Sequence, residues 1–192
     1  MDMITVKKRN PDEKTKKLRR AGFVPCVIFG GGLQESVSIQ VEEPIARKLV
    51  RFKREGSKLQ LKLDGQTIPV QIKEKELNTL NNEIVHISFQ ALRSDQKVNS
   101  IIHIILKNSD MIAGTLERML LEIPYASLPA DMIDTVTVDL EGMPVGTVLT
   151  VADVPEFKSE KIDLQVDDSS LILRINDKIR SAKKGAAEDA AE

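Results

Sequence analysis

Cysteine and long apolar runs are almost missing from this sequence. Cys26 is the only cysteine among 192 residues, which excludes an internal disulfide and a cysteine-based metal cage. Its neighbours are all apolar: Val24, Pro25, Val27 and Ile28. Because apolar burial raises a thiol pKa, we predict an unreactive core residue rather than a nucleophile. No apolar run reaches the roughly 20 residues that a membrane-spanning helix requires, and the first residues lack a secretory signal. We therefore expect a cytoplasmic protein without membrane contact.

Residues suited to metal binding or catalysis are also few. His86 and His103 are the only histidines, and two ligands from distant segments do not make a metal site. The glycines at 30–32 lack the Lys-Ser/Thr continuation of a phosphate-binding loop, so a flexible hairpin or loop is the better interpretation. No pair of carboxylates stands out beside a nucleophile or a base. We predict that the protein is not an enzyme and that it needs no cofactor and no metal.

The net charge of −1 conceals an uneven distribution along the chain. Residues 1–94 carry 18 Lys and Arg against 11 Asp and Glu, a net charge of +7. Residues 95–192 carry 10 against 18, a net charge of −8. An asymmetry of this kind favours a polyanionic partner for the first half only, although two oppositely charged solvated surfaces are an alternative.

The start of the chain predicts two short helices and two strands. KKRNPDEKTKKLRRAG predicts a helix at about residues 11–21, with Pro11 in its first turn and Gly22 at its end. VPCVIFG is typical of a buried strand that ends at the glycines, and SVSIQV alternates like a second strand. A second helix is predicted to begin at Glu43-Pro44, with three apolar residues at helical spacing before Gly56: Ile45, Leu49 and Phe52.

Alternating residues predict a hairpin and a further strand. KLQLKL and QTIPVQIK flank Asp64-Gly65, a strong two-residue turn signal. The apolar positions are expected to face inward: Leu59, Leu61, Leu63, Ile68, Val70 and Ile72. The polar positions are expected to face outward: Lys58, Gln60, Lys62, Gln71 and Lys73. VHISFQAL repeats the pattern, with Val85, Ile87 and Phe89 inward and His86, Ser88 and Gln90 outward. Six or so strands with two small helices favour a closed or nearly closed barrel, because closure removes edge strands.

A polar stretch, RSDQKVNS, separates the basic half from the acidic half, and we place the domain boundary near Ser94. Further strand signals follow at 101–106, TVTVDL, VGTVLTVADV, KIDLQV and SLILRI, while residues 116–123 fit a helix or a strand. The sequence therefore predicts a mainly β protein with a few short helices. We expect an N-terminal six-stranded β-barrel at 1–94, a C-terminal all-β domain at 95–180 and a disordered tail at 181–192.

Several motifs resemble one family. The run RRAGFVPCVIFG, an arginine-rich helix followed by a strand ending in an aromatic-Gly pair, resembles the bacterial 5S rRNA-binding ribosomal proteins (large-subunit protein number twenty-five). DGQTIPVQIKEKELN and EIVHISF are similar to later parts of the same domain. LPADMIDTVTVDLEGMPVGTVLTVADV resembles the second domain of the longer CTC general-stress members. The resemblance covers most of residues 7–176.

The resemblance implies a barrel whose exposed face and N-terminal helix bind an irregular, wide-minor-groove section of 5S rRNA. It implies partners in the large ribosomal subunit, including neighbouring ribosomal proteins, a ribosome-associated location in the cytoplasm, and a monomer off the ribosome. Its motif positions imply these RNA-binding residues in this sequence: Arg9, Lys16, Arg19, Arg20, Phe29, Gly30, Lys73, Glu76, His86 and Ser88.

Three of these positions depart from the family pattern. Members commonly carry Tyr at the position of Phe29, Gln at that of Glu76 and Asp at that of Ser88. Phe29 keeps a stacking surface but loses a hydroxyl, and Glu76 brings an anion toward phosphate. Ser88 cannot orient His86 as strongly as a carboxylate would. Two hypotheses therefore stand: a large-subunit protein that binds 5S rRNA, or a divergent stress-type paralogue that has lost tight 5S binding and acts through protein contacts.

Overall fold

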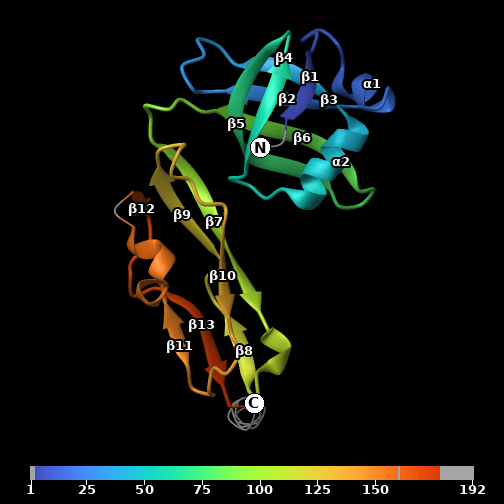
Figure 1. Ribbon diagram of the computed structural model, residues 1–192. Helices are drawn as coiled ribbons and strands as arrows, with labels where there is room; N and C mark the ends of the chain where they lie inside the picture. Colours follow the sequence, from blue (N-terminus) through green and yellow to red (C-terminus); the bar gives the residue numbers. More distant parts are fainter. Residues whose placement is uncertain (1–2, 160, 178–192) are drawn as a thin grey trace, which may run out of the picture. The chain divides into compact units, whose positions relative to one another are not determined.

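The computed structural model describes residues 3–159 and 161–177, which form two compact units (Figure 1). Unit 1 takes the described residues up to Ser100 together with Leu128–Asp134. Unit 2 takes Ile101–Ser127 and the described residues from Thr135 onward. The predicted boundary at Ser94 falls in a turn between two strands of the chain. The predicted tail at 181–192 lies outside the described residues.

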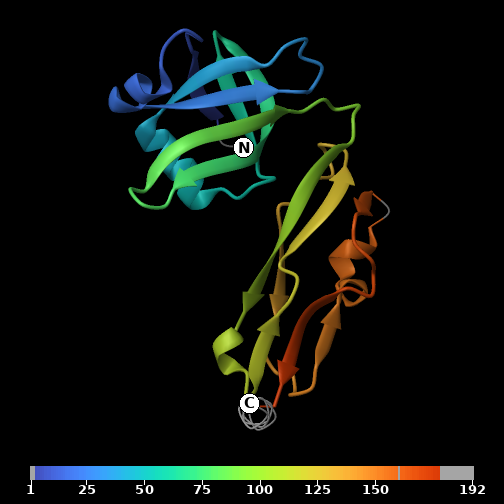
Figure 2. The ribbon, with the colours of Figure 1, turned by 180° about the vertical axis from the view of Figure 1, so that it is seen from behind.

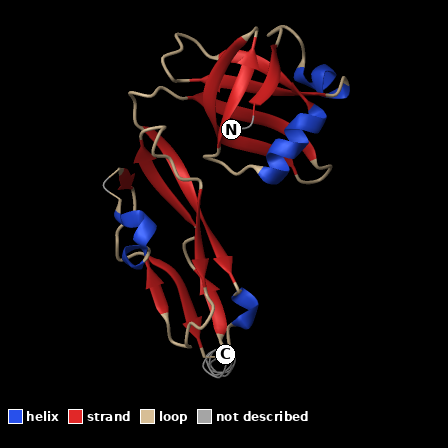
Figure 3. Cartoon of the chain, in the orientation of Figure 1, coloured by secondary structure: helices blue, strands red, loops and turns tan. Residues whose placement is uncertain are grey.

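Six strands of unit 1 form a closed barrel (Figure 3), which confirms the predicted architecture. Their order is β1-β3-β2-β6-β5-β4. Their bounds are β1 Met3–Lys8, β2 Phe23–Phe29, β3 Val37–Glu42, β4 Lys58–Leu63, β5 Gln66–Asn78 and β6 Glu83–Ala91. The barrel closes through β1, which pairs antiparallel with β3 and parallel with β4. The sequence did not single out β1, because its apolar residues stand beside the lysines of the basic start.

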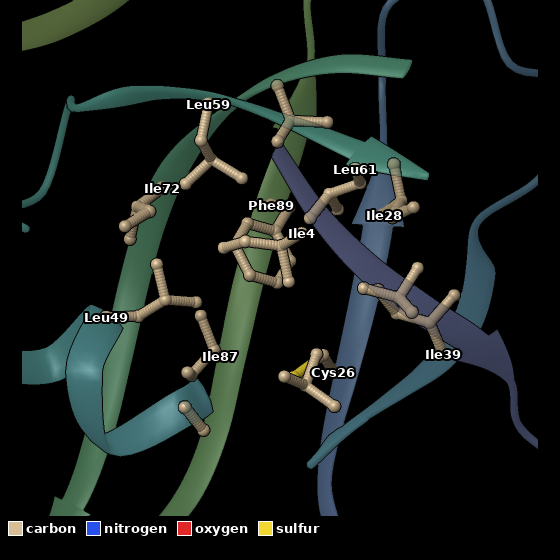
Figure 4. Close-up of a cluster of buried hydrophobic side chains, with 14 of the residues drawn as sticks. Ile4, Cys26, Ile28, Ile39, Leu49, Leu59, Leu61, Ile72, Ile87 and Phe89 are labelled. Carbon is tan, nitrogen blue, oxygen red and sulfur yellow. The ribbon is translucent and has the colours of Figure 1, made fainter. Parts of the chain in front are cut away.

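The aliphatic residues that the alternation predicted fill the barrel together with the aromatic Phe89 (Figure 4). The turn between β4 and β5 also agrees with the prediction, since Asp64 and Gly65 both have positive φ, at 48° and 85°. Cys26 is 1% exposed and belongs to this core. Burial raises the pKa of its thiol to about 12, so the predicted unreactive core cysteine is confirmed.

One inward assignment was wrong, and one outward-facing residue proved to be covered. Val85 is only half-buried and lies outside the core, whereas its neighbour Ile84 is 4% exposed and belongs to it. The cause is a register shift between β5 and β6 near Glu76, which interrupts the alternation of two. Gln71 was expected to be exposed, but its exposure is 0%. Gln71 does not belong to the barrel core, and its side chain is covered by Gln90 and by Asn99, to which it donates hydrogen bonds.

Both helices of unit 1 pack on the outside of the barrel (Figure 2). The first, α1, spans only Thr15–Arg20, because the chain around Pro11 forms a turn instead of the predicted first helical turn. The second, α2, spans Glu43–Phe52 and begins where Glu43-Pro44 predicted. Leu49 is 4% exposed and reaches the core, whereas Phe52, expected on the same buried stripe, is 70% exposed.

Unit 2 contains two open sheets. The first has the order β10-β7-β9-β12 and the second β11-β13-β8. The strands are β7 Val98–Lys107, β8 Thr115–Arg118, β9 Glu122–Ser127, β10 Thr135–Asp139, β11 Val148–Thr150, β12 Ile162–Leu164 and β13 Leu171–Asn176. The ambiguous 116–123 segment is thus mostly strand. VGTVLTVADV forms a strand only at β11, and its continuation is the 3-10 helix η2, Val151–Asp153; η1, Ser109–Met111, and η3, Pro155–Lys158, are the other short helices.

The Leu128–Asp134 segment belongs to unit 1 although it follows β9 in the chain. Met132 is 8% exposed and clusters with Leu92 and Val98. Lys58 on β4 donates a hydrogen bond from Nζ to the carbonyl of Pro129 at 2.9 Å. Unit 1 is therefore larger than the predicted 1–94 domain, because a distant loop completes its surface.

Candidate nucleic-acid interface

Four of the ten predicted RNA-binding residues lie on the outer face of β2, β6 and β5. On β6, Ile87 and Phe89 are fully buried, so His86 and Ser88 between them point outward and are half-buried. The register places Glu76 of β5 opposite His86. Phe29 of β2 lies on the other side of β6, opposite Gln90. Residues about 60 positions apart in the sequence thus share one surface.

The end of β2 brings Gly30 close to the same strand. Gly30 has φ of +74°, a conformation that glycine adopts without strain. A Cβ built there would lie 3.4 Å from Cγ of Gln90. The next residue, Gly31, is tighter, since a Cβ would lie 2.6 Å from the carbonyl oxygen of Ala91. The glycines therefore allow the β2–β3 loop to lie against the end of β6, and they do not form a separate phosphate loop.

The helix α1 lies at the opposite end of β6 from Gly30. Arg19 donates from Nε to Oε1 of Glu83, the first residue of β6, at 2.7 Å, and from Nη1 to the Val85 carbonyl at 3.5 Å. Its side chain is 21% exposed and lines a crevice of about 130 Å³. Arg19 consequently holds α1 against the strand that carries His86, which is a positioning task. Lys16 and Arg20 are exposed and make no ion pair with any described residue.

Arg9 is also held within unit 1. Its Nη2 donates to the carbonyl of Glu13 at 2.9 Å, and its backbone N–H donates to the carbonyl of Ser38 at 3.0 Å. The side chain is half-buried, and its Nε is buried without a hydrogen-bond partner. Arg9 thus fixes the turn that precedes α1, where its guanidinium is only partly available to a ligand.

Lys73 occupies a register irregularity of β5, between Ile72 and Glu74. It is exposed, and its Nζ lies 3.4 Å from the carbonyl oxygen of Asn99. Gln71 on the same strand donates from Nε2 to Gln90 Oε1 at 2.8 Å and to the Asn99 carbonyl at 3.1 Å. The start of β7 therefore borders the candidate surface and accepts hydrogen bonds from Gln71 and Lys73.

The surface carries anions as well as cations. Glu74 lies opposite Ser88 in the register, and both Glu74 and Glu76 are exposed. Glu83 is the third carboxylate, although Arg19 pairs with it. Glu74, Gln90 and Glu83 were not among the residues that the sequence motifs predicted for the site. The pairing of β5 with β6 is the signal that identifies them, and it depends on a register shift that the sequence does not reveal.

Other predicted features can be placed among the described residues. His103 on β7 is 6% exposed, and its Nδ1 lies 3.5 Å from Oε1 of Glu122. In the described part of the chain no three His, Cys, Asp or Glu side chains are grouped as a metal site would require. Within the same residues, every helix is too short or too polar to cross a membrane.

Two family models match this two-unit chain in succession. Residues 4–89 match the ribosomal L25p family, and residues 97–178 match the C-terminal domain of ribosomal protein TL5. The fold and both matches define a two-domain ribosomal protein, and the chain belongs to the ribosomal L25p family in its longer form. This is a family of ribosomal proteins and not of enzymes, in agreement with the sequence-based prediction.

Curated relatives cover both units. A protein of Thermoanaerobacter sp. (strain X514) is 25% identical over 171 residues, which are 88% of this chain and 84% of the relative. A protein of Chloroherpeton thalassium is 29% identical over 170 residues, which are 85% of this chain and 84% of the relative. A protein of Desulfitobacterium hafniense is 29% identical over 167 residues, which are 84% of this chain and 89% of the relative. Each relative is named large ribosomal subunit protein bL25.

Proposed function

We propose that the protein is a component of the large ribosomal subunit that binds 5S rRNA through the outer face of β2, β6 and β5 and through α1. The observation that carries this proposal is the convergence of Phe29, Glu76 and His86 on one side of the barrel. The same residues were selected from motif positions far apart in the sequence. A surface built from three strands is wide enough to follow a helical RNA groove.

The chemistry of this surface suits folded RNA better than a base-specific pocket. A-form RNA presents 2′-hydroxyl groups and base edges in a wide, shallow minor groove. His86 and Ser88 offer hydrogen-bonding groups to such a groove, while Phe29 adds a flat apolar side chain. Lys16 and Arg20 of α1 supply exposed cations for phosphates. Arg19 and Arg9 then act by holding α1 and its preceding turn in place.

The surroundings of His86 differ from the family pattern. Family members commonly place a carboxylate two residues after this histidine, where the present chain has Ser88. Here the register places a carboxylate across the strand pair, at Glu76. Glu76 shares the outer face with His86 and therefore brings an anion near the proposed RNA surface.

A filter-binding titration of the full chain with 5S rRNA at several salt concentrations tests the proposal. We expect saturable binding that weakens steeply as salt rises, because cations that neutralise phosphates release counterions. His86→Ala should weaken binding by about 1 kcal/mol, the net value of a hydrogen bond. His103→Ala on the buried side of unit 2 is the matched control for RNA affinity. Folded protein that shows no binding at low salt would contradict the proposal.

The exposed carboxylates Glu74 and Glu76 favour a second candidate, in which the protein is a divergent stress-type paralogue that acts through protein contacts. Glu74→Gln removes an exposed anion from the proposed surface, so under the first proposal it should tighten 5S rRNA binding and leave its salt dependence similar. Under the second candidate, neither Glu74→Gln nor Ser88→Asp changes RNA affinity. Equal affinity of both variants and the unchanged protein would favour the paralogue.

A further inference from the structure

Phe52 stands apart from the other aromatic residues of the protein. The chain has five Phe, one Tyr and no Trp, all within the described residues. Phe89, Phe157 and Tyr125 are buried, and Phe23 and Phe29 are half-buried, whereas Phe52 is 70% exposed at the last position of α2. Exposure of a whole aromatic ring at a helix end leaves apolar surface in water without any packing gain inside unit 1.

Phe52 forms one wall of an apolar groove. The groove has a volume of about 210 Å³ and is lined by Ile4 of β1 and by five residues of α2 and its end: Ile45, Lys48, Leu49, Phe52 and Lys53. The apolar stripe of α2 runs from Ile45 through Leu49 to Phe52, but its burial ends at Leu49. A space of this volume accepts one planar ring or one side chain, and it is too small for the face of a helix.

Cations surround the open side of this groove. Lys48 lies one helical turn before Phe52, so the two side chains are neighbours on the helix surface. The guanidinium carbon of Arg51 lies 5.3 Å from the centroid of the Phe52 ring, a cation-π geometry. Arg54 follows within two residues and is exposed, as are Lys48 and Arg51. This combination of an exposed ring, a stacked guanidinium and flanking cations matches an unpaired nucleotide, whose base stacks while its phosphates meet the cations.

The groove lies where α2 meets the barrel core. Ile4 and Leu49 line it and also belong to that core. His86 lies on the outer face of β6, and the groove-lining residues come from β1 and α2 with its end. The start of α2 lies near α1, since Glu43 lines the crevice that Arg19 and Glu83 also line. The Phe52 groove, at the other end of α2, is therefore distinct from the His86 surface.

We infer that the groove of α2 binds an unpaired base of a second RNA segment, stacked on Phe52 with its phosphates on Lys48, Arg51 and Arg54. The charge of the groove selects a polyanion, and the chain belongs to a ribosomal family, so RNA is the polyanion that fits. The barrel then contacts a folded RNA helix through β6 and a single-stranded segment through the end of α2. This site goes beyond the proposed 5S rRNA contact and does not depend on it.

A fluorescence experiment on the full chain tests this site. Since the protein has no Trp, Phe52→Trp introduces a single reporter at the groove. Titration with an oligoadenylate of about ten nucleotides, the length of one single-strand binding site, should quench the Trp emission through base stacking. In a polarisation assay with labelled oligoadenylate, Phe52→Ala should bind roughly tenfold more weakly, within the range of a lost stacking contact. Phe52→Tyr, which keeps the ring, should bind like the unchanged protein.

The controls separate this site from the 5S rRNA surface and from a protein partner. Met111→Ala, at a 71% exposed apolar residue of unit 2, should not change oligoadenylate affinity. Phe52→Ala should keep its 5S rRNA affinity, and His86→Ala should keep its oligoadenylate affinity. If the protein fails to bind 5S rRNA but still binds oligoadenylate through Phe52, the inference about the α2 groove holds. Absence of quenching, or unchanged oligoadenylate affinity in Phe52→Ala, overturns it. Tighter binding of an acidic peptide than of oligoadenylate also overturns it, since the groove would then be a protein site.

Discussion

Each of the six barrel strands pairs with two neighbours, whereas the strands of unit 2 form open sheets of four and three strands. In the described part of unit 2, β10, β12, β11 and β8 are therefore edge strands. The difference extends to strand length, since β5 has 13 residues while β11 and β12 have three each. Closure gives a barrel strand two partners that fix its register and extend its pairing.

Charge follows the same division. The net charge is +7 over residues 1–94 and −8 over residues 95–192. A closed barrel has no edge strand whose outer positions must discourage edge pairing, whereas open sheets do. The basic half of the sequence thus folds mainly as a closed barrel, and the acidic half folds mainly as two open sheets.

The largest expected effect comes from emptying the barrel core. Phe89 has no exposed area, so Phe89→Ala removes its packing and leaves a cavity, at an expected loss of about 3–5 kcal/mol in the free energy of unfolding. Urea denaturation measures the loss, and hydrogen exchange assigns it to a unit. Amides of β2 and β6 should lose protection while those of β13 keep theirs. Equal loss in β13 would show that the two units do not have separate cores.

A smaller effect is expected where the outer face of the barrel is covered. Gln71→Ala breaks the hydrogen bonds to Gln90 and to the Asn99 carbonyl and leaves buried polar groups without partners. The expected loss of stability is about 1–3 kcal/mol. The control is Gln66→Ala, at an exposed residue of the same strand, which should be nearly neutral. If both variants unfold at the same urea concentration, the covering segment contributes nothing to the barrel.

The charge comparison can be tested with RNA. Arg20→Ala in α1 should weaken 5S rRNA binding by roughly 1 kcal/mol and lower the logarithmic salt slope by about one, the change expected for one phosphate contact. Arg174→Ala, on β13 of unit 2, should leave both quantities unchanged. An equal effect of the two substitutions would show that binding does not distinguish the basic unit from the acidic one.

The Arg19–Glu83 pair should contribute a modest coupling. A double-mutant cycle with Arg19→Gln and Glu83→Gln is expected to give about 0.5–1 kcal/mol, because both groups are partly exposed to solvent. The Arg47–Glu43 pair within α2 is the matched control, with an expected value of about 0.3–0.5 kcal/mol. A coupling below that of the control would mean that the pair does not hold α1 against β6.

The smallest effect is a pH dependence of unit 2. Hydrogen bonds from the Thr150 hydroxyl and backbone N–H lower the pKa of Asp153 below its ordinary 3.8, and those from the Glu141 backbone and Asn108 do the same for Asp139. A lowered carboxyl pKa adds stability that is complete above the unfolded pKa and is lost as pH falls through the folded pKa. Unit 2 should thus weaken slightly below about pH 4. In Asp153→Asn, circular dichroism during acid titration should show a smaller pH-dependent loss.

Sequence analysis predicted much of the fold because local patterns are decisive in particular elements. The Asp64-Gly65 turn, the start of α2 at Glu43-Pro44 and the burial of Cys26 all depend on residues close in the chain. Alternation with a period of two defined β4 and most of β5 and β6. The candidate site was predicted as a set of residues from family motifs, but not as a surface, since adjacency across strands depends on register.

Tertiary structure alone decided the features that involve distant partners. The closing strand β1, the register shift that places Ile84 inside in place of Val85, and the covered Gln71 all depend on which strands pair. Arg19 proved to be an ion-pair partner of Glu83, 64 residues away. Phe52 became exposed because the helix passes its last buried contact at Leu49. The sequence by itself determined the period, the turns and the division of charge, which are short-range properties. Pairing, register and burial were set by packing free energies that arise only when distant segments meet.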